Sequence, residues 1–111
     1  MNEEGVFLLT GTGANIDVKC GWVPAKVEVM NITSAGLEKL EWYRGMAAAS
    51  AIKTTSAPAR TKITTLGITP LGAAVGDTVE QGFRIGADTD VNVSGELIVA
   101  IATRGGEGNQ V

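Results

Sequence analysis

Histidine is missing from this sequence of 111 residues, and only one cysteine, Cys20, is present. Without histidine, neither a Ser-His-Asp triad nor a Cys-His pair can form, and the commonest general base and metal ligand is lost. One cysteine cannot form a disulfide within the chain, and a CxxC pair for a metal or redox site is ruled out. We expect Cys20 to be a small buried residue. We also expect no catalytic, cofactor-binding or metal-binding residues and no cofactor, although a site built from carboxylates alone stays open.

Charge and long apolar runs are also scarce. Twelve acidic and nine basic residues give a net charge of -3. Because Lys and Arg do not cluster, the chain lacks a surface that could neutralise several phosphates, and we expect no nucleic-acid partner. No apolar run approaches the roughly 18 residues of a membrane span, so we expect no membrane partner. The acidic start Met-Asn-Glu-Glu does not resemble a signal peptide, which favours synthesis in a cytoplasm.

The residues that are abundant favour short strands and tight turns. The chain contains 15 glycines but only five aromatic residues, and its apolar part is built mainly from Ala, Val, Ile and Leu. Its length fits one domain, which we place at residues 1–104 with a flexible tail at 105–111.

Alternation of apolar and polar residues predicts seven or eight short strands. Residues 37–45 are ambiguous between helix and strand, and Leu40, Trp42 and Met46 favour a strand. The strands are expected at residues 6–9, 16–20, 27–33, 37–45, 51–54, 61–68, 82–86 and 97–102. This pattern predicts an all-β fold, either a β-sandwich or a small jelly-roll-like barrel with Gly-rich turns.

Three segments carry further expectations. The segment Pro70–Asp77 reads as a long loop and a candidate for partner binding. The strand Leu97–Ala102 is apolar at both parities, which predicts a central strand covered on both faces. The strand Thr61–Ile68 is rich in β-branched residues, and its edges are expected to need pairing or cover, either of which a neighbouring chain can supply.

Two short motifs resemble ligand sites. Asp88-Thr-Asp90-Val-Asn92 has the oxygen spacing with which a calcium loop begins, but Val93 and Val99 occupy the positions of the required Gly and Glu. We favour a solvated turn there, and an ion at Asp88 and Asp90 stays open.

The stretch Gly11-Thr-Gly13 resembles the start of a phosphate-binding GxGxxG loop but has Ile16 in place of the third glycine. We favour a hairpin turn at this place. The aromatic residues could form a ligand-binding cluster, but core packing is the preferred interpretation. They are Phe7, Trp22, Trp42, Tyr43 and Phe83.

The order of four segments resembles that of small virion proteins of tailed phages, the capsid decoration or cement proteins. The segments are 21–33 (GWVPAKVEVMNIT), 40–46 (LEWYRGM), 82–88 (GFRIGAD) and 91–97 (VNVSGEL). The resemblance spans roughly residues 5–104 and implies an all-β structural protein without catalytic residues. Its implied partners are the major capsid protein and further copies of itself, as a homotrimer or a dimer, on the surface of the virion.

The function expected from these features is therefore a decoration protein that binds the outside of a phage head and stabilises its lattice. The segments Asn2–Phe7 and 70–82 are the expected contact regions, because both are expected to be flexible and without a role in internal packing. An alternative is a receptor- or carbohydrate-binding module of a spike or fibre that uses Trp22, Trp42 and Tyr43.

Overall fold

The computed structural model describes residues 4–55, 59–72 and 80–104. These ranges form strands and turns without a helix, so the all-β prediction is confirmed. The strands are β1 (Glu4–Thr10), β2 (Ile16–Lys19), β3 (Lys26–Asn31), β4 (Lys39–Tyr43), β5 (Ser50–Thr54), β6 (Arg60–Leu71), β7 (Gly82–Ile85) and β8 (Leu97–Thr103). In the described part of the chain, no helix is long and apolar enough to cross a membrane.

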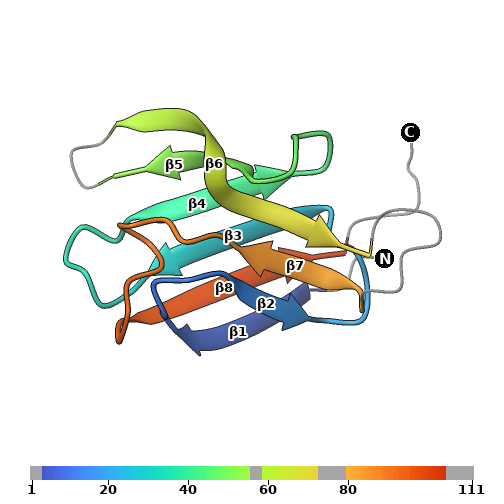
Figure 1. The fold of residues 1–111 in the computed structure, drawn as a ribbon, viewed down its shortest axis with the longest axis horizontal. Helices are drawn as coiled ribbons and strands as arrows, with labels where there is room; N and C mark the ends of the chain where they lie inside the picture. Colours follow the sequence, from blue (N-terminus) through green and yellow to red (C-terminus); the bar gives the residue numbers. More distant parts are fainter. Residues whose placement is uncertain (1–3, 56–58, 73–79, 105–111) are drawn as a thin grey trace.

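The described strands form one antiparallel sheet that curls into a half-barrel (Figure 1). Their order is β1-β8-β3-β4-β5-β6-β7-β2. β1 and β2 therefore lie at opposite ends of the sheet, although only residues 11–15 separate them in the chain. So short a link requires the two ends of the sheet to approach each other. The rings of Phe7 on β1 and Phe83 on β7 meet edge to face across the interior, with centroids 6.1 Å apart.

The core follows from the two-residue period of the strands. In β3, for example, Val27 and Val29 are fully buried while Glu28 and Met30 point to the other face. Each large apolar side chain buried in this way contributes about 1.5–3 kcal/mol of transfer free energy. The buried apolar residues are Val18, Val27, Val29, Leu40, Trp42, Ala51, Ile68, Leu71, Phe83, Ile85, Val91, Ile98, Ala100 and Ala102.

β6 turns the corner of the half-barrel. Its first four residues pair with β5 and its last four with β7. Between them, residues 64–67 bulge opposite the junction of Ser50 and Ala51, and a bulge increases the local twist. Leu66 adopts a left-handed backbone with φ of 63°. At Gly67, a Cβ atom would lie 2.4 Å from the carbonyl oxygen of Ser50, so only glycine fits at this corner.

Two predictions about β6 and the loop after it need correction. Pro70 and Leu71 belong to β6 rather than to a loop, and residues 73–79 lie outside the described ranges. Pro70 is tolerated because the pairing of β5 with β6 stops at Ile68, so no ladder needs its missing N–H on that side. The prediction about the edges of the strand Thr61–Ile68 also needs correction, because strands of the same chain supply pairing, β5 along residues 60–63 and β7 along residues 68–71.

The prediction that Leu97–Ala102 is covered on both faces is also wrong. In β8 the buried residues alternate with half-buried or exposed ones. Ile98, Ala100 and Ala102 point into the core. The alternate residues, beginning with Leu97, have side chains on the outer face of the sheet. Its apolar residues therefore form a surface rather than a second core layer.

The turn at Gly11–Gly13 is not a hairpin turn, because it joins two strands that do not pair with each other. Gly11 instead lies against the segment before β8. Its N–H donates to the carbonyl of Glu96 at 2.7 Å, and a Cβ atom at this position would lie 2.1 Å from the carbonyl oxygen of Val93. The glycine is required by this close approach and not by phosphate binding.

Candidate binding surface

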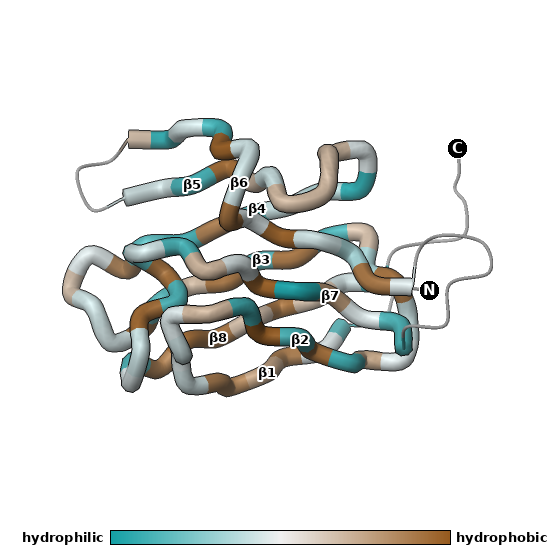
Figure 2. Tube along the Cα trace, viewed as in Figure 1, coloured by the Kyte–Doolittle hydropathy of each residue, from teal (hydrophilic) through white to brown (hydrophobic). Residues whose placement is uncertain are grey.

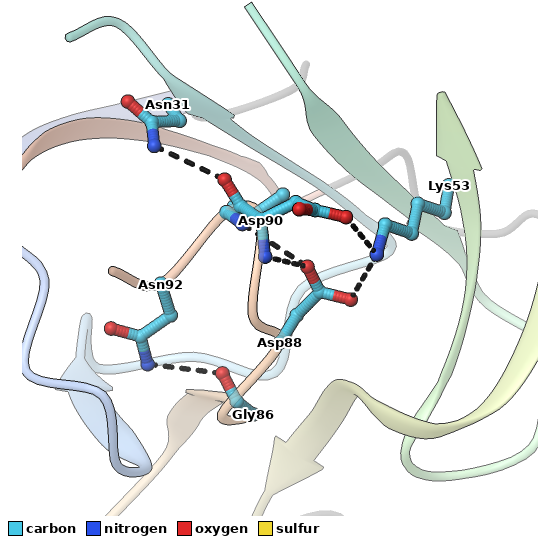
Figure 3. Close-up of polar contacts among 7 residues, drawn as sticks. Asn31, Lys53, Gly86, Asp88, Asp90 and Asn92 are labelled. Atoms are coloured by element: carbon cyan, nitrogen blue, oxygen red, sulfur yellow. Dashed lines mark hydrogen bonds and ion pairs between the residues drawn. The ribbon is translucent and has the colours of Figure 1, made fainter. Parts of the chain in front are cut away.

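A polar cluster occupies the turn between β7 and β8 at one end of the half-barrel (Figure 3). Asp88 is 3% exposed, and its Oδ1 accepts hydrogen bonds from the backbone N–H groups of Asp90 at 2.9 Å and Val91 at 3.1 Å. This arrangement is an Asx turn, which an aspartate forms readily with the backbone two residues ahead. The prediction of a turn at Asp88 is confirmed, but the aspartate is buried rather than solvated.

Lys53 on β5 supplies the positive charge for this turn. Its Nζ lies 3.0 Å from Oδ2 of Asp88 and 2.7 Å from Oδ2 of Asp90. Burial disfavours the ammonium and would lower its pKa. The hydrogen bonds and charges of Asp90 and Asp88 outweigh burial, so the pKa of Lys53 is raised above its usual 10.5. The ammonium therefore stays charged through the neutral range.

Asn92 connects this turn to the link between β1 and β2. Its Oδ1 accepts from the N–H groups of Thr12 at 2.9 Å and Gly13 at 3.4 Å. Its Nδ2 donates to the carbonyl oxygens of Ala14 at 2.6 Å and Gly86 at 3.0 Å. One buried side chain thereby satisfies four backbone groups from two segments, which holds the first and last parts of the chain together.

Asn31 does the same for the turn after β3. Its Nδ2 donates to Oε1 of Glu96 at 2.7 Å and to the carbonyl of Asp90 at 3.1 Å. Its Oδ1 accepts from the N–H groups of Thr33 and Ser34. The partners of the four cluster side chains Asn31, Lys53, Glu96 and Asn92 could not be read from the sequence.

The geometry does not gather the oxygens of Asp88, Asp90 and Asn92 around one point for a calcium ion. The Nζ of Lys53 lies between the two carboxylates, and Asn92 points away to the link at residues 12–14. Within the described ranges, no group of three or more Cys, Asp and Glu side chains is placed to hold a metal ion. The cluster is therefore arranged to join segments of the fold.

The aromatic residues do not form one surface. Phe83 is fully buried and Trp42 is 3% exposed, with its Nε1 donating to the carbonyl of Ala47. Tyr43 follows Trp42 in β4, so it points to the opposite face of the sheet and is exposed. Trp22 is partly buried and packs against the core. The preferred interpretation as core residues is confirmed except for Tyr43. Trp22, Trp42 and Tyr43, on which the alternative function depends, do not share one exposed surface.

Cys20 is partly buried against the core, and its Sγ donates to the carbonyl of Trp22 at 3.2 Å. The prediction that Cys20 is a small buried residue is therefore confirmed only in part. Close by, a hollow of about 290 Å³ is lined by Lys19, Gly21, Glu80 and Gln81. Lys19 and Glu80 are charged and form an ion pair with each other, whereas Gly21 and Gln81 carry no charge. All four residues are exposed. The hollow offers no group that is held for chemistry.

The outer face of β1 and β8 is the unusual surface of the molecule. Val6 is 66% exposed, Leu8 is 65% exposed and Leu97 is 44% exposed. These residues lie on one face of two paired strands, where Val6 is opposite Ile101, Leu8 is opposite Val99, and Thr10 is opposite Leu97. Figure 2 shows apolar colours along much of both strands. We call Val6, Leu8, Leu97, Val99 and Ile101 the apolar outer face.

This surface includes part of one expected contact region, but for a different reason. The segment Asn2–Phe7 was expected to be flexible and without a packing role. Its described part, from Glu4 onward, pairs with β8, and Phe7 packs on Phe83. Only the outward side chain of Val6 in this part is both apolar and exposed. The other expected region, 70–82, is strand at Pro70, Leu71 and Gly82, and its residues 73–79 are outside the described ranges.

Comparison of the chain with models of protein families, with curated proteins and with solved structures finds no match.

Proposed function

We propose that this chain is a structural binding protein that attaches to other proteins through the apolar outer face. The observation that carries the proposal is the exposure of Val6, Leu8 and Leu97 side by side on paired strands. Single exposed apolar residues are common, but a contiguous group on a rigid sheet is typical of a surface that another protein covers. Covering it would release the hydration of these side chains without unfolding any part of the sheet.

The partner is proposed from the sequence. The order of the segments 21–33, 40–46, 82–88 and 91–97 resembles decoration proteins of tailed phages. We infer that the chain binds the major capsid protein on the outside of the head and stabilises the capsid lattice. The net charge of -3 and the scattered basic residues support a protein partner better than a nucleic acid.

The proposed function involves no catalysis and no cofactor. The carboxylates and the ammonium that the fold brings together, those of Asp88, Asp90 and Lys53, are already engaged in hydrogen bonds that hold turns in place. Asn31 and Asn92 are likewise occupied on both their oxygen and nitrogen atoms. Such groups stabilise a binding surface by fixing the segments around it.

The finer architecture belongs to the same proposal. In Figure 1, β2 and β7 lie in front of β8, so that the curled sheet has two layers over much of its length. This arrangement supports a flattened barrel of the sandwich or jelly-roll type, which is a common scaffold of capsid proteins. An experimental structure that shows an open, single-layered sheet would contradict it.

The test is electron cryomicroscopy of expanded, undecorated heads that are incubated with the purified chain. The expected map has added density on the capsid surface with β1 and β8 facing the capsid. Heads incubated with buffer provide the control. A map without added density contradicts the proposed function, and density in which β5 and β6 face the capsid contradicts the assignment of the surface. A glycan array that shows sugar binding would favour the carbohydrate-binding alternative instead.

A further inference from the structure

The outward edge of β1 is an open strand edge. Within the described ranges, β1 pairs only with β8. Hydrogen-bonded pairs alternate along an antiparallel ladder, and the N–H of Gly11 bonds to Glu96 just beyond the pair Thr10–Leu97. The odd-numbered residues of β1 therefore bond to β8. The N–H and C=O groups of Val6 and Leu8 point to the open edge.

This edge lacks the devices by which proteins block strand pairing. Such devices are proline, lysine, bulges and short length. β1 has seven residues, contains neither proline nor lysine, and pairs with β8 in an unbroken register. At the other end of the sheet, β2 has only four residues and carries the charged side chains of Asp17 and Lys19 on its exposed face. These two terminal edges are therefore unequal, and that of β1 is the better suited to pairing.

We infer that β1 pairs with β1 of a second copy of this chain, antiparallel and edge to edge, about a two-fold axis at Phe7. Phe7 is the middle residue of Glu4–Thr10, so this register gives every residue of the strand a partner. Val6 then lies opposite Leu8 of the second copy, and Glu4 lies opposite Thr10. Registers centred on Val6 or Leu8 leave one end of the strand unpaired.

The side chains agree with this register. Val6 and Leu8 are on the outer face, so the four apolar side chains of the two copies lie next to each other beside Val99 and Ile101. Cross-strand apolar pairs of this kind stabilise a sheet by about 0.2–1 kcal/mol each. No like charges meet, because Glu4 is the only charged residue of β1 and lies opposite a threonine.

The size of the contact sets the expected affinity. A stable dimer buries about 800 Å² on each partner, and one pair of seven-residue strands covers less than that. The dimer is therefore expected to dissociate on dilution through the micromolar range. Pairing joins two apolar outer faces into one surface of twice the width. Only the role of the dimer, to present this wider surface to the capsid, rests on the proposed function.

Disulfide trapping tests the register. In a Cys20→Ser background, a Val6→Cys chain is mixed with a Leu8→Cys chain that carries a mass tag. Hydrogen-bonded antiparallel pairs have Cα atoms about 5.5 Å apart, within the range that a disulfide spans. The mixed disulfide is expected to form at least tenfold faster than either homodimer. An Asp17→Cys chain on the edge of β2 is the control, and equal rates for all pairs would overturn the inference.

Sedimentation of a Val6→Pro variant tests the edge itself. Proline removes the N–H that points to the open edge and leaves the bonds to β8 in place, whereas Val6→Thr keeps that N–H. Wild type and Val6→Thr are expected to dimerise and Val6→Pro to remain a monomer with a melting temperature close to that of wild type. A wild-type chain that stays monomeric but still decorates heads overturns the pairing and leaves the proposed function standing. A wild-type dimer that leaves heads bare upholds the pairing and contradicts the proposed function.

Discussion

The polar cluster and the apolar outer face reverse the usual distribution of side chains. At the end of the half-barrel, Asn31, Asp88 and Asn92 are almost completely buried. On β1, Val6 and Leu8 are about two-thirds exposed. The buried polar groups are joined by hydrogen bonds, so they fix the fold at that end. The exposed apolar groups contribute little to folding and are available to a partner.

The difference teaches that stability and binding reside in separate parts of this small protein. A buried polar side chain is costly when it loses its partner, typically by 1–3 kcal/mol for each group left unsatisfied. An exposed apolar side chain on a strand can be replaced at a cost within about 0.5 kcal/mol. Substitutions in the polar cluster should therefore lower stability, and substitutions on the apolar outer face should weaken association.

The largest effect is expected for Asn92→Ala. The side chain of Asn92 satisfies four backbone groups, and the substitution leaves all of them, including the N–H of Thr12 and the carbonyl of Gly86, without this partner. We expect a loss of about 3 kcal/mol in the free energy of unfolding, measured by urea denaturation. Asn15→Ala, at an exposed position in the same link, is the control. A change in Asn92→Ala no larger than in the control would contradict the role of the cluster.

Lys53→Met should have the next largest effect. It leaves the carboxylate of Asp88, whose side chain is 5% exposed, without a cation. Removing one member of a buried ion pair costs about 3 kcal/mol or more. Because Asp90 is half exposed and water can reach this edge, we expect the free energy of unfolding to fall by about 2 kcal/mol. Lys62→Met, at an exposed position of β6, provides the comparison. Equal denaturation midpoints for the two variants would show that the ion pair is dispensable.

These effects concern residues that the sequence placed only in part. Alternation predicted the strands at residues 27–33 and 37–45, which contain Val27, Val29, Leu40 and Trp42, because a two-residue period is visible in any strand. It could not bring Lys53 to Asp88, because that contact depends on which strands are neighbours.

The same limit applies to the surface. The apolar run that contains Val6 and Leu8 was visible, and so was the apolar character of Leu97 and Val99. Which parity faces outward, and that β1 is a terminal strand, depend on the order of strands in the sheet. Strand order is set by long-range pairing, such as that of β1 with β8. A single sequence does not record this pairing.

The dependence of the unfolding free energy on pH in the alkaline range should reveal the contribution of the charged Lys53. Its pKa is raised in the folded state, so its contribution is complete below 10.5 and is lost as the pH rises through the higher folded pKa. Between wild type and Lys53→Met, the difference in unfolding free energy should shrink above pH 10.5. Denaturation at several pH values measures it. A constant difference across that range would contradict the charged pair.

The smallest effect is expected for Asp17→Asn on the edge of β2. Oδ1 of Asp17 lies 2.7 Å from Nε of Arg84, and this hydrogen bond lowers the pKa of Asp17 below 3.8, against the opposing effect of partial burial. The pair therefore stabilises the fold above pH 3.8 and loses its contribution as the pH falls through the lowered pKa. Because both side chains are exposed, we expect less than about 0.5 kcal/mol at neutral pH. A loss above 1 kcal/mol by thermal melting would show that this edge depends on the ion pair.

The separation of binding from stability is tested most directly by a double variant, Val6→Lys/Leu8→Lys, compared with Thr64→Lys/Thr65→Lys. Both variants add two positive charges at exposed strand positions, one on the apolar outer face and one on β6. Affinity for undecorated heads and the free energy of unfolding are measured on the same preparations. We predict at least a tenfold loss of affinity for the β1 variant alone, with both variants as stable as wild type to within about 1 kcal/mol. Equal affinities for the two variants would contradict the account.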